Sequence, residues 1–392
     1  MVELLAPAGD LEKLKIAILY GADAVFIGGL KFSLRSRASN FTLEDIKEGC
    51  TFAHEHHAKV HITCNIVMHE IDTEDILEYL KALEEAGVDA IIASSITILK
   101  LVVQHTSMEA HVSTQTSCLN QEAVAFYKEL GVKRVVLGRE LTLEEIEFVK
   151  KNTSIDLEVF IHGGMCVSYS GRCMLSNNMT NRDANRGGCA HSCRWNYNLY
   201  QKDHKINPEG DYFAMSSKDL CAIRAIPKLM ELGIHSFKIE GRMKSLHYIA
   251  TIVKAYRTLI DDINSNSLKD FNYYEAMINK AENRLTSTGF LFGLPTIDEQ
   301  LYDLDASIPN KDFVGIVLDY DETTKKATIE QRNHFVPNSS LEVFGPHHND
   351  VIKIKEVYDK DNVSLDAARH PRQIVYFYTD YPLEKDDLLR LN

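Results

Sequence analysis

The sequence has little of what marks an exported or membrane-embedded protein. Its first residues, MVELLAPAGD, contain no basic segment followed by an apolar one, so we expect no signal peptide. No run approaches the length of about 18 apolar residues that a membrane-spanning helix needs. We therefore expect a cytoplasmic protein, in a compartment where clustered cysteines more often bind metal or do redox chemistry than form disulfides.

Several enzyme signatures are also missing. No glycine-rich dinucleotide-binding motif follows the first predicted strand, and no G-x-S-x-G segment marks a serine hydrolase. The segment AHEHHAKVH begins like a zinc-protease motif at His54 and Glu55, but Ala58 stands where the second histidine ligand belongs. We interpret these histidines as the solvated end of a helix. Two others, His111 and His162, lie near predicted strand ends, where each is either structural or a catalytic base.

Positive charge is scarce overall but locally concentrated. The 392-residue chain has a net charge of −13, which argues against broad, non-specific nucleic-acid binding. Between residues 161 and 200, however, only Asp183 opposes the basic residues Arg172, Arg182, Arg186 and Arg194. Trp195 and Tyr197 lie beside them, either as a platform on which bases stack or as packing for the segment. The arginines suit a phosphate-bearing partner, or they pair with acids elsewhere.

One pattern recurs along the first three quarters of the chain. A glycine, one or two polar residues and a short apolar run follow one another in YGADAVFIG, AGVDAIIAS, LGVKRVVLG and LGIHSFKIEG. This order is typical of a helix that leads into a buried parallel strand. Together with the intervening segments it predicts eight strands, near residues 4, 26, 62, 92, 111, 136, 159 and 238. We therefore predict an α/β protein with a TIM-like (β/α)₈ barrel over residues 1–305, with a doubly wound sheet as the alternative.

Two further segments complete the predicted organisation. The long gap before the eighth strand predicts a cysteine-rich insertion over residues 165–230, at the C-terminal face of the barrel where active sites lie. Residues 294–312 are polar and irregular and are interpreted as a linker. Short alternating runs such as KATIEQ and IVYFYT then predict a small C-terminal all-β barrel of five to six strands over residues 313–392.

Five of the chain's eight cysteines lie in the insertion: four in the pattern Cys166-x6-Cys173-x15-Cys189-x3-Cys193, and then Cys221. Neither half has the two-residue gap common at structural zinc sites. Thiolates on a glycine-rich loop suit an iron–sulfur cluster, while zinc binding and buried or redox-active cysteines are the alternatives. The other three cysteines lie in regular helix or strand patterns and are interpreted as packing residues: Cys50, Cys64 and Cys118.

Several long segments form a specific signature: EVFIHGGMCVSYSGRCMLS, CAHSCRW, SSKDLC and KIEGRMKS, with LLAPAGD and GGLKFSLRSRASNF near the start. Together they resemble the peptidase U32 family, and the resemblance covers essentially the whole chain. The chain looks most like members of the tRNA 5-hydroxyuridine type. The resemblance implies a [4Fe–4S] cluster, prephenate as the hydroxyl donor and a wobble uridine in a tRNA anticodon loop as substrate. Other implied functions are a collagenase-like peptidase and a cluster-holding scaffold that acts with a homologous partner protein.

The resemblance implies the cluster ligands, and positions at strand ends predict the residues that bind substrate and catalyse. The implied cluster ligands are Cys166, Cys173 and Cys189, with Cys221 as the fourth and Cys193 as its alternative. Prephenate is a dicarboxylate, for which guanidinium groups are suitable ligands. The predicted substrate-binding residues follow strands and are Arg35, Arg37, Arg139, Gln115 and Asn65. The predicted catalytic residues are Glu240, Arg242 and His162.

Overall fold

The computed structural model describes residues 2–33, 40–281, 284–301 and 312–392. The described residues divide into two compact units. The larger comprises residues 2–279 and 284–301, and the smaller comprises residues 280–281 and 312–392.

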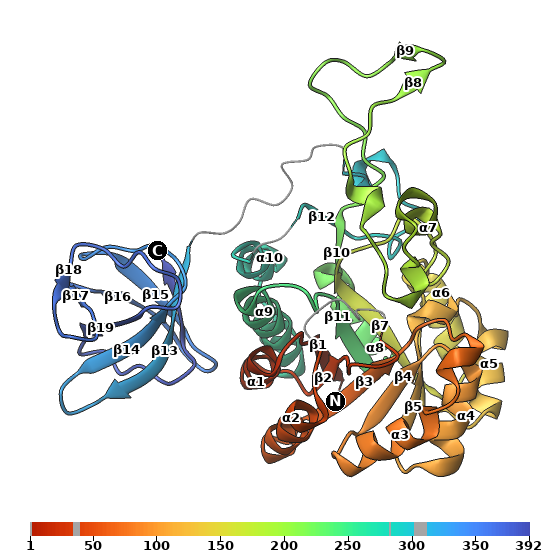
Figure 1. Cartoon of the computed structure of the whole chain (residues 1–392), viewed down its shortest axis with the longest axis horizontal. Helices are drawn as coiled ribbons and strands as arrows, with labels where there is room; N and C mark the ends of the chain where they lie inside the picture. Colours follow the sequence, from red (N-terminus) through yellow and green to blue (C-terminus); the bar gives the residue numbers. More distant parts are fainter. Residues whose placement is uncertain (1, 34–39, 282–283, 302–311) are drawn as a thin grey trace. The chain divides into compact units, whose positions relative to one another are not determined.

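The larger unit is the predicted TIM-like barrel (Figure 1). Within the described residues, eight parallel strands pair in chain order, and the last pairs with both the seventh and the first, which closes the ring. The eight are β1 (Glu3–Pro7), β2 (Ala24–Ile27), β3 (Lys59–Cys64), β4 (Ala90–Ala93), β5 (Glu109–Val112), β6 (Arg134–Val136), β7 (Asp156–Gly163) and β11 (Ser236–Ile239). All eight predicted strand positions are confirmed.

Amphipathic helices surround the strands. They are α1 (Leu11–Leu19), α2 (Leu43–Glu55), α3 (Ile76–Glu85), α4 (Ile96–His105), α5 (Gln121–Glu129), α6 (Leu143–Lys151), α8 (Ile226–Glu231), α9 (Leu246–Asn264) and α10 (Phe271–Asn279). Helix α6 begins with a capping box, in which Thr142 Oγ1 accepts from the Glu145 amide and the Glu145 carboxylate accepts from the Thr142 amide. Helix α2 ends at Glu55, and His54 is exposed, as the predicted solvated helix end requires.

Charged side chains fill part of the barrel interior. Arg134 Nη1 lies 2.5 Å from Glu3 Oε1 and 3.1 Å from Glu158 Oε2, and Lys238 Nζ lies 2.7 Å from Glu158 Oε1. Burial alone would raise the pKa of Glu158, but Lys238 and Arg134 outweigh burial and hold this pKa well below its usual value. Glu3 and Arg134 begin their strands, so the Arg134–Glu3 pair lies away from the C-terminal strand ends and does not form part of the rim.

The predicted insertion leaves the barrel after β7. It contains α7 (Leu175–Thr180), the short 3₁₀ turns η3 (Ala184–Arg186) and η4 (Ser192–Arg194), the hairpin strands β8 (Tyr200–Gln201) and β9 (His204–Lys205), and β10 (Asp219–Cys221). The last of these pairs antiparallel with β7 and parallel with β12 (Thr286–Ser287). The chain then passes through η5 (Ile223–Ala225) into α8, so the insertion ends near residue 225 and not at residue 230.

The smaller unit is an antiparallel β domain. In its described residues, eight strands form one sheet in the order β16-β15-β20-β13-β14-β19-β17-β18. They are β13 (Phe313–Asp321), β14 (Lys326–Gln331), β15 (Ser340–Phe344), β16 (Asn349–Lys353), β17 (Val357–Tyr358), β18 (Ser364–Leu365), β19 (Ile374–Tyr378) and β20 (Leu388–Leu391). They enclose an apolar core of their own, which includes Val317, Ile329 and Phe377. The prediction of five to six strands took β16 and β17 as one run, VIKIKEVY, and missed the short β18 and the terminal β20.

The predicted linker is only partly described, since residues 302–311 lie outside the described residues. The preceding stretch is ordered on the larger unit: it forms η6 (Ile297–Glu299), and the Leu301 amide donates to the Ser216 carbonyl.

Candidate four-cysteine site

Four cysteines of the insertion line one cavity of about 230 Å³ at the C-terminal face of the barrel: Cys166, Cys173, Cys189 and Cys193. None of these thiols is in a disulfide. Burial raises the pKa of the Cys193 thiol, Arg194 lowers it, and the other three thiols raise it further, so each of the three lies within electrostatic range of Cys193. Residues that are up to 27 positions apart in sequence therefore converge on one space.

Cys221 lies elsewhere. It is on β10 and lines a separate pocket of about 210 Å³ together with Arg224, Glu275 and Thr286. Its sulfur accepts from the Tyr256 hydroxyl at 3.9 Å, and burial raises the pKa of its thiol. The expectation that Cys221 is the fourth ligand does not match this arrangement. The structure groups Cys193, the alternative, with the other three cysteines.

The donor set suits an iron–sulfur cluster. Within the described part of the chain, no three His, Cys, Asp or Glu side chains lie close enough together to hold a single metal ion. A [4Fe–4S] cluster makes a different demand, because each of its four thiolates binds a different iron. Four free thiols around one cavity meet that demand in number and in chemistry.

Two glycines seat the cysteine loop against the barrel rim. Gly163 has φ +104°, and a Cβ there would come within 2.5 Å of the Glu240 carbonyl oxygen. Gly171 has φ +77°, and a Cβ there would come within 2.0 Å of the Gln115 carbonyl oxygen. Both positions combine a left-handed backbone with close packing, so only glycine fits without rearrangement.

Polar contacts hold the insertion on the loops that follow other strands. Arg186 Nη1 lies 2.5 Å from Asp72 Oδ2, and the Ser170 amide donates to Glu140 Oε1 at 3.1 Å. The Asn185 side-chain amide donates to the Cys173 carbonyl at 3.1 Å. The backbone that carries the cysteines is therefore fixed from several sides.

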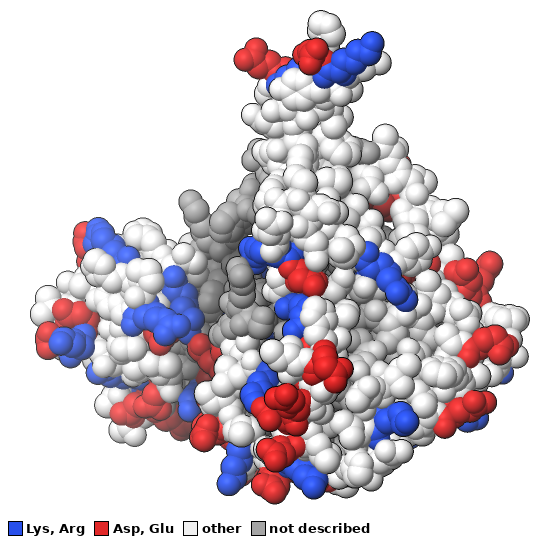
Figure 2. Space-filling view, turned by 45° about the vertical axis from the view of Figure 1, so that its right-hand side comes forward, with Lys and Arg blue, Asp and Glu red and all other residues white. Residues whose placement is uncertain are grey.

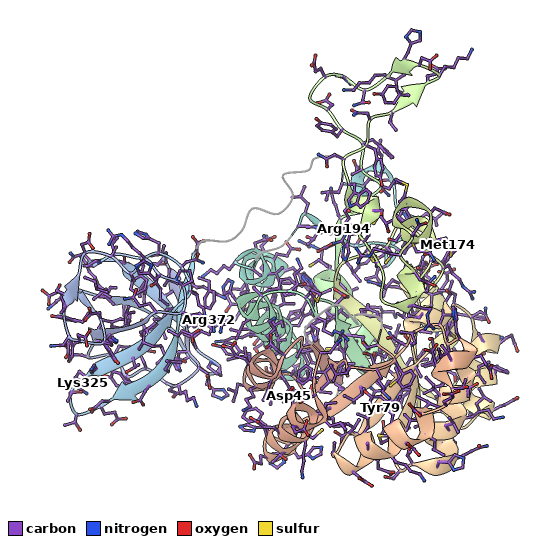
Figure 3. The ribbon with its side chains drawn as sticks, viewed as in Figure 1. Asp45, Tyr79, Met174, Arg194, Lys325 and Arg372 are labelled. Atoms are coloured by element: carbon purple, nitrogen blue, oxygen red, sulfur yellow. The ribbon has the colours of Figure 1, made fainter. Side chains whose placement is uncertain are left out.

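Charged and polar side chains share the cavity with the thiols. They include Gln115, Arg139, His191, Arg194, Asp219, Glu240 and Lys244. Three of these were predicted: Glu240 as a catalytic residue, and Arg139 and Gln115 as substrate-binding residues. Arg139 donates to the Gly164 carbonyl, and its guanidinium lies 4.6 Å from the centre of the Phe160 ring. Figure 3 labels Arg194 on the insertion.

Lys244 and Asp219 are site residues that sequence reasoning missed. Burial raises the pKa of Asp219, while Arg284, Lys244 and Arg194 lower it. Burial also lowers the pKa of Lys244. The family segments SSKDLC and KIEGRMKS contain these two residues and were the available signal, but only their cysteine, glutamate and arginine were assigned roles.

Asn65 lines an adjoining pocket of about 320 Å³. Gln115, Gly171 and Asn185 line both this pocket and the four-cysteine cavity, so the two spaces are neighbours. The remaining predicted substrate residues, Arg35 and Arg37, lie outside the described residues.

Arg242 does not line the cavity. It is buried, and its guanidinium donates to Ser33 Oγ at 2.8 Å, Thr63 Oγ1 at 3.3 Å and Asn40 Oδ1 at 3.1 Å. These contacts make it an anchor between the end of β11 and the segments that follow β2 and end β3.

His162 does not line the cavity either. Its Nδ1 lies 3.3 Å from the Tyr256 hydroxyl on α9, and its ring packs edge-on against that tyrosine. The β7–β11 register shifts between Lys238 and Ile239, opposite Phe160 and His162. Such irregularities redirect side chains. His111 is also buried, 2.9 Å from Glu109.

The hairpin segment beyond Arg194 stands away from the barrel (Figure 1). Trp195, Tyr200 and Tyr212 are exposed, which does not agree with the interpretation of Trp195 as packing. Tyr197 is used structurally, since its hydroxyl donates to the Ser192 carbonyl at 2.7 Å and its backbone pairs with Phe213. Figure 2 shows charged side chains of both signs at the tip.

Comparison with known families decides where the chain belongs. The model of peptidase family U32 matches residues 9–301, and the model of the peptidase family U32 C-terminal domain matches residues 309–390. The chain is a member of the peptidase U32 family.

Curated U32 relatives carry two kinds of name. The "tRNA hydroxylation protein P1" of Bacillus subtilis is 48% identical, over 99% of this chain and 94% of its own length. An "uncharacterized protease" of Methanocaldococcus jannaschii is 36% identical over 92% of each chain. The "tRNA hydroxylation protein P" of Escherichia coli is 33% identical, over 88% of this chain and 87% of its own length.

A search for membrane spans among the described residues gave a negative result: none of the helices combines the length and the apolar character that a bilayer crossing requires.

Proposed function

We propose that this U32 chain is an iron–sulfur enzyme that hydroxylates a uridine of tRNA without molecular oxygen, with prephenate as the hydroxyl donor. The observation that carries the proposal is the convergence of Cys166, Cys173, Cys189 and Cys193 on one cavity at the barrel rim. The names of the Bacillus and Escherichia relatives support tRNA as the substrate.

In this proposal, the four thiols hold a [4Fe–4S] cluster, which supplies electron transfer or organises the site when bound. Gly163 and Gly171 keep the loop close to the rim, so the ligands are held by packed backbone. The ion pair of Arg186 with Asp72 and the hydrogen bond from Asn185 to the Cys173 carbonyl also hold the loop in place.

The cations of the cavity bind the donor. Arg139, Arg194 and Lys244 approach the space from the β6 loop, the insertion and the β11 loop. Guanidinium and ammonium groups around a small cavity suit a dicarboxylate, because a partly desolvated site strengthens charge-assisted hydrogen bonds. Asp219 and Glu240 keep the cavity from becoming uniformly positive, and each is a candidate to hold a proton during the reaction.

The uridine reaches the cavity from an anticodon loop, whose bases are already unpaired, so exposing one costs little. Exposed Trp195 next to Arg194 and the four-cysteine loop is positioned to stack on a neighbouring base.

The first test is purification without oxygen. We expect a brown protein with about four irons per chain, since a [4Fe–4S] cluster contains four. In a deletion strain, hydroxylated uridine should disappear from tRNA, return with the wild-type gene, and fail to return with Cys166→Ala or when prephenate synthesis is blocked. A colourless, zinc-loaded protein that still restores the modification would contradict the cluster.

The peptidase and scaffold functions make different predictions. A peptidase would cleave denatured collagen, and Cys166→Ala would not abolish the cleavage. A scaffold would restore no modification alone, but would do so with a homologous partner. His162 and His111 are buried and do not line the cavity, so neither is placed as the base of a hydrolytic pair there.

A further inference from the structure

A groove of about 460 Å³ lies in the smaller unit, far in sequence from the four-cysteine loop. It is lined by Lys325, Ile352, Lys353, Lys355, Glu356, Tyr358, Tyr378, Thr379, Asp380 and Tyr381. Lysines and tyrosines predominate among these residues, although the smaller unit has more acidic than basic residues. Figure 3 labels Lys325, which lies at the turn between β13 and β14.

Strand register brings the tyrosines together. Tyr376 and Tyr378 alternate along β19 with Val375 and Phe377, which are fully buried in the core, so the tyrosines are on the outer face. Tyr378 pairs with Lys326, and Tyr358 of β17 pairs with Tyr376. The rings of Tyr358 and Tyr378 meet edge to face with centres 5.8 Å apart, and Tyr378 is 46% exposed.

The cations around the groove are available to a ligand. Among the residues that the structure describes, Lys325, Lys353 and Lys355 form no ion pair. Of the two acids in the groove, Glu356 accepts the Tyr358 hydroxyl, and Asp380 is exposed. Lys326 Nζ lies 3.7 Å from the centre of the Tyr376 ring, which leaves the other three lysines to meet an anion.

We infer that this lysine–tyrosine groove binds a single-stranded segment of RNA. Ammonium groups contact phosphates, and an exposed tyrosine ring stacks on a base, which is the combination that unpaired nucleic acid requires. The inference rests on the proposed function only for RNA as the partner, and does not depend on the cluster, on prephenate or on the reaction. An acidic peptide would use the lysines but has no need of the rings.

The test uses the full chain and a fluorescein-labelled oligouridine, with binding followed by anisotropy over a range of salt. We expect Lys353→Glu/Lys355→Glu to weaken binding at least ten-fold and to flatten the logarithmic salt dependence by about 1.4, the value for two phosphate contacts on a single strand. Lys360→Glu/Lys385→Glu changes the same charge at two exposed sites outside the groove, and should alter affinity less than two-fold.

Tyrosine variants test the stacking. Tyr378→Ala should weaken binding about five-fold to one hundred-fold, while Tyr378→Phe, which keeps the ring, should bind like wild type. Circular dichroism confirms that each variant is folded. Equal losses in the groove and control pairs, a Tyr378→Ala variant that binds normally, or tighter binding of polyglutamate than of oligouridine would each overturn the inference.

The two proposals can fail separately. A protein that binds oligouridine through the groove but carries no iron would leave the groove inference in place and remove the cluster. A Lys353→Glu/Lys355→Glu protein that is brown, modifies tRNA normally and binds oligouridine as tightly as wild type would remove the groove inference and leave the cluster in place.

Discussion

At the scale of single residues, the open question from the sequence is whether Cys193 or Cys221 is the fourth cluster ligand. We expect Cys193→Ser to lose most of its iron and visible absorbance, because its sulfur shares the cavity with the other three thiols. Cys221→Ser should keep about four irons per chain, since its sulfur lies in another pocket. Iron analysis of both proteins, purified side by side without oxygen, provides the measurement. Loss of iron in Cys221→Ser with retention in Cys193→Ser would restore the original assignment.

Arg242 and His162 show that position near a strand end does not by itself decide what a side chain contacts. Both lie at or near the end of a barrel strand, where catalytic groups are expected. Arg242 is occupied with Ser33, Thr63 and Asn40, and His162 with Tyr256. These contacts assign positioning and packing roles to two residues that were predicted to be catalytic from their positions near strand ends.

At the scale of elements, the start of α6 depends on Thr142. Its hydroxyl accepts from the Glu145 amide at 3.2 Å, which satisfies a donor that the helix itself cannot pair. Thr142→Ala should lower the free energy of unfolding of the barrel by about 1 kcal/mol, measured by urea titration. Thr142→Ser keeps the oxygen and should lose only a small part of this. Equal losses in both variants would mean that packing of the methyl group, and not capping, is responsible.

The barrel strands also predict how stability depends on pH. His61 is fully buried, both ring nitrogens lack hydrogen-bond partners among the described residues, and burial lowers its pKa to about 3. Its pKa in the unfolded chain is about 6.5, so unfolding takes up a proton below that pH. The free energy of unfolding should therefore fall as pH decreases below about 6.5, and His61 alone should contribute about 2 kcal/mol of the loss between pH 7 and pH 5.

A substitution in the core also changes the stability at every pH. The contribution of His61 is therefore isolated by comparing the slopes of the free energy of unfolding against pH. Calorimetry of the barrel transition should show a flatter pH dependence for His61→Gln. Exposed His105→Gln serves as the control and should keep the wild-type slope. An unchanged slope in His61→Gln would show that the ring is protonated in the folded protein or that other groups dominate.

At the scale of the whole molecule, the smaller unit has a core of its own, which includes Phe335, Val343 and Leu389. We expect a fragment of residues 312–392 to fold alone and to melt cooperatively, within about 5 °C of the corresponding transition in the full chain, because a compact domain with its own core is an independent folding unit. Circular dichroism and calorimetry provide the measurement. A fragment that is unfolded at 25 °C would show that this unit needs the rest of the chain.

Local pattern was enough for the barrel and for the family. Runs such as AVFI in β2 and AIIA in β4 are buried along their whole length, which is why continuous apolar stretches predicted parallel strands. The capping box of α6 is equally local, because the interaction between Thr142 and Glu145 spans only three residues. Strand β18 was missed because two residues leave no alternation to detect.

The sequence by itself determined the two architectures, the insertion after the seventh strand and the presence of more thiols than a cluster needs. The tertiary structure decided which thiols meet, which rim residues face the cavity and where a second, lysine-lined groove forms. The physical reason is that strand and helix patterns depend on neighbours within a few residues. The direction of a side chain at a strand end depends instead on a register shift such as that at His162, and on loops packed from distant parts of the chain.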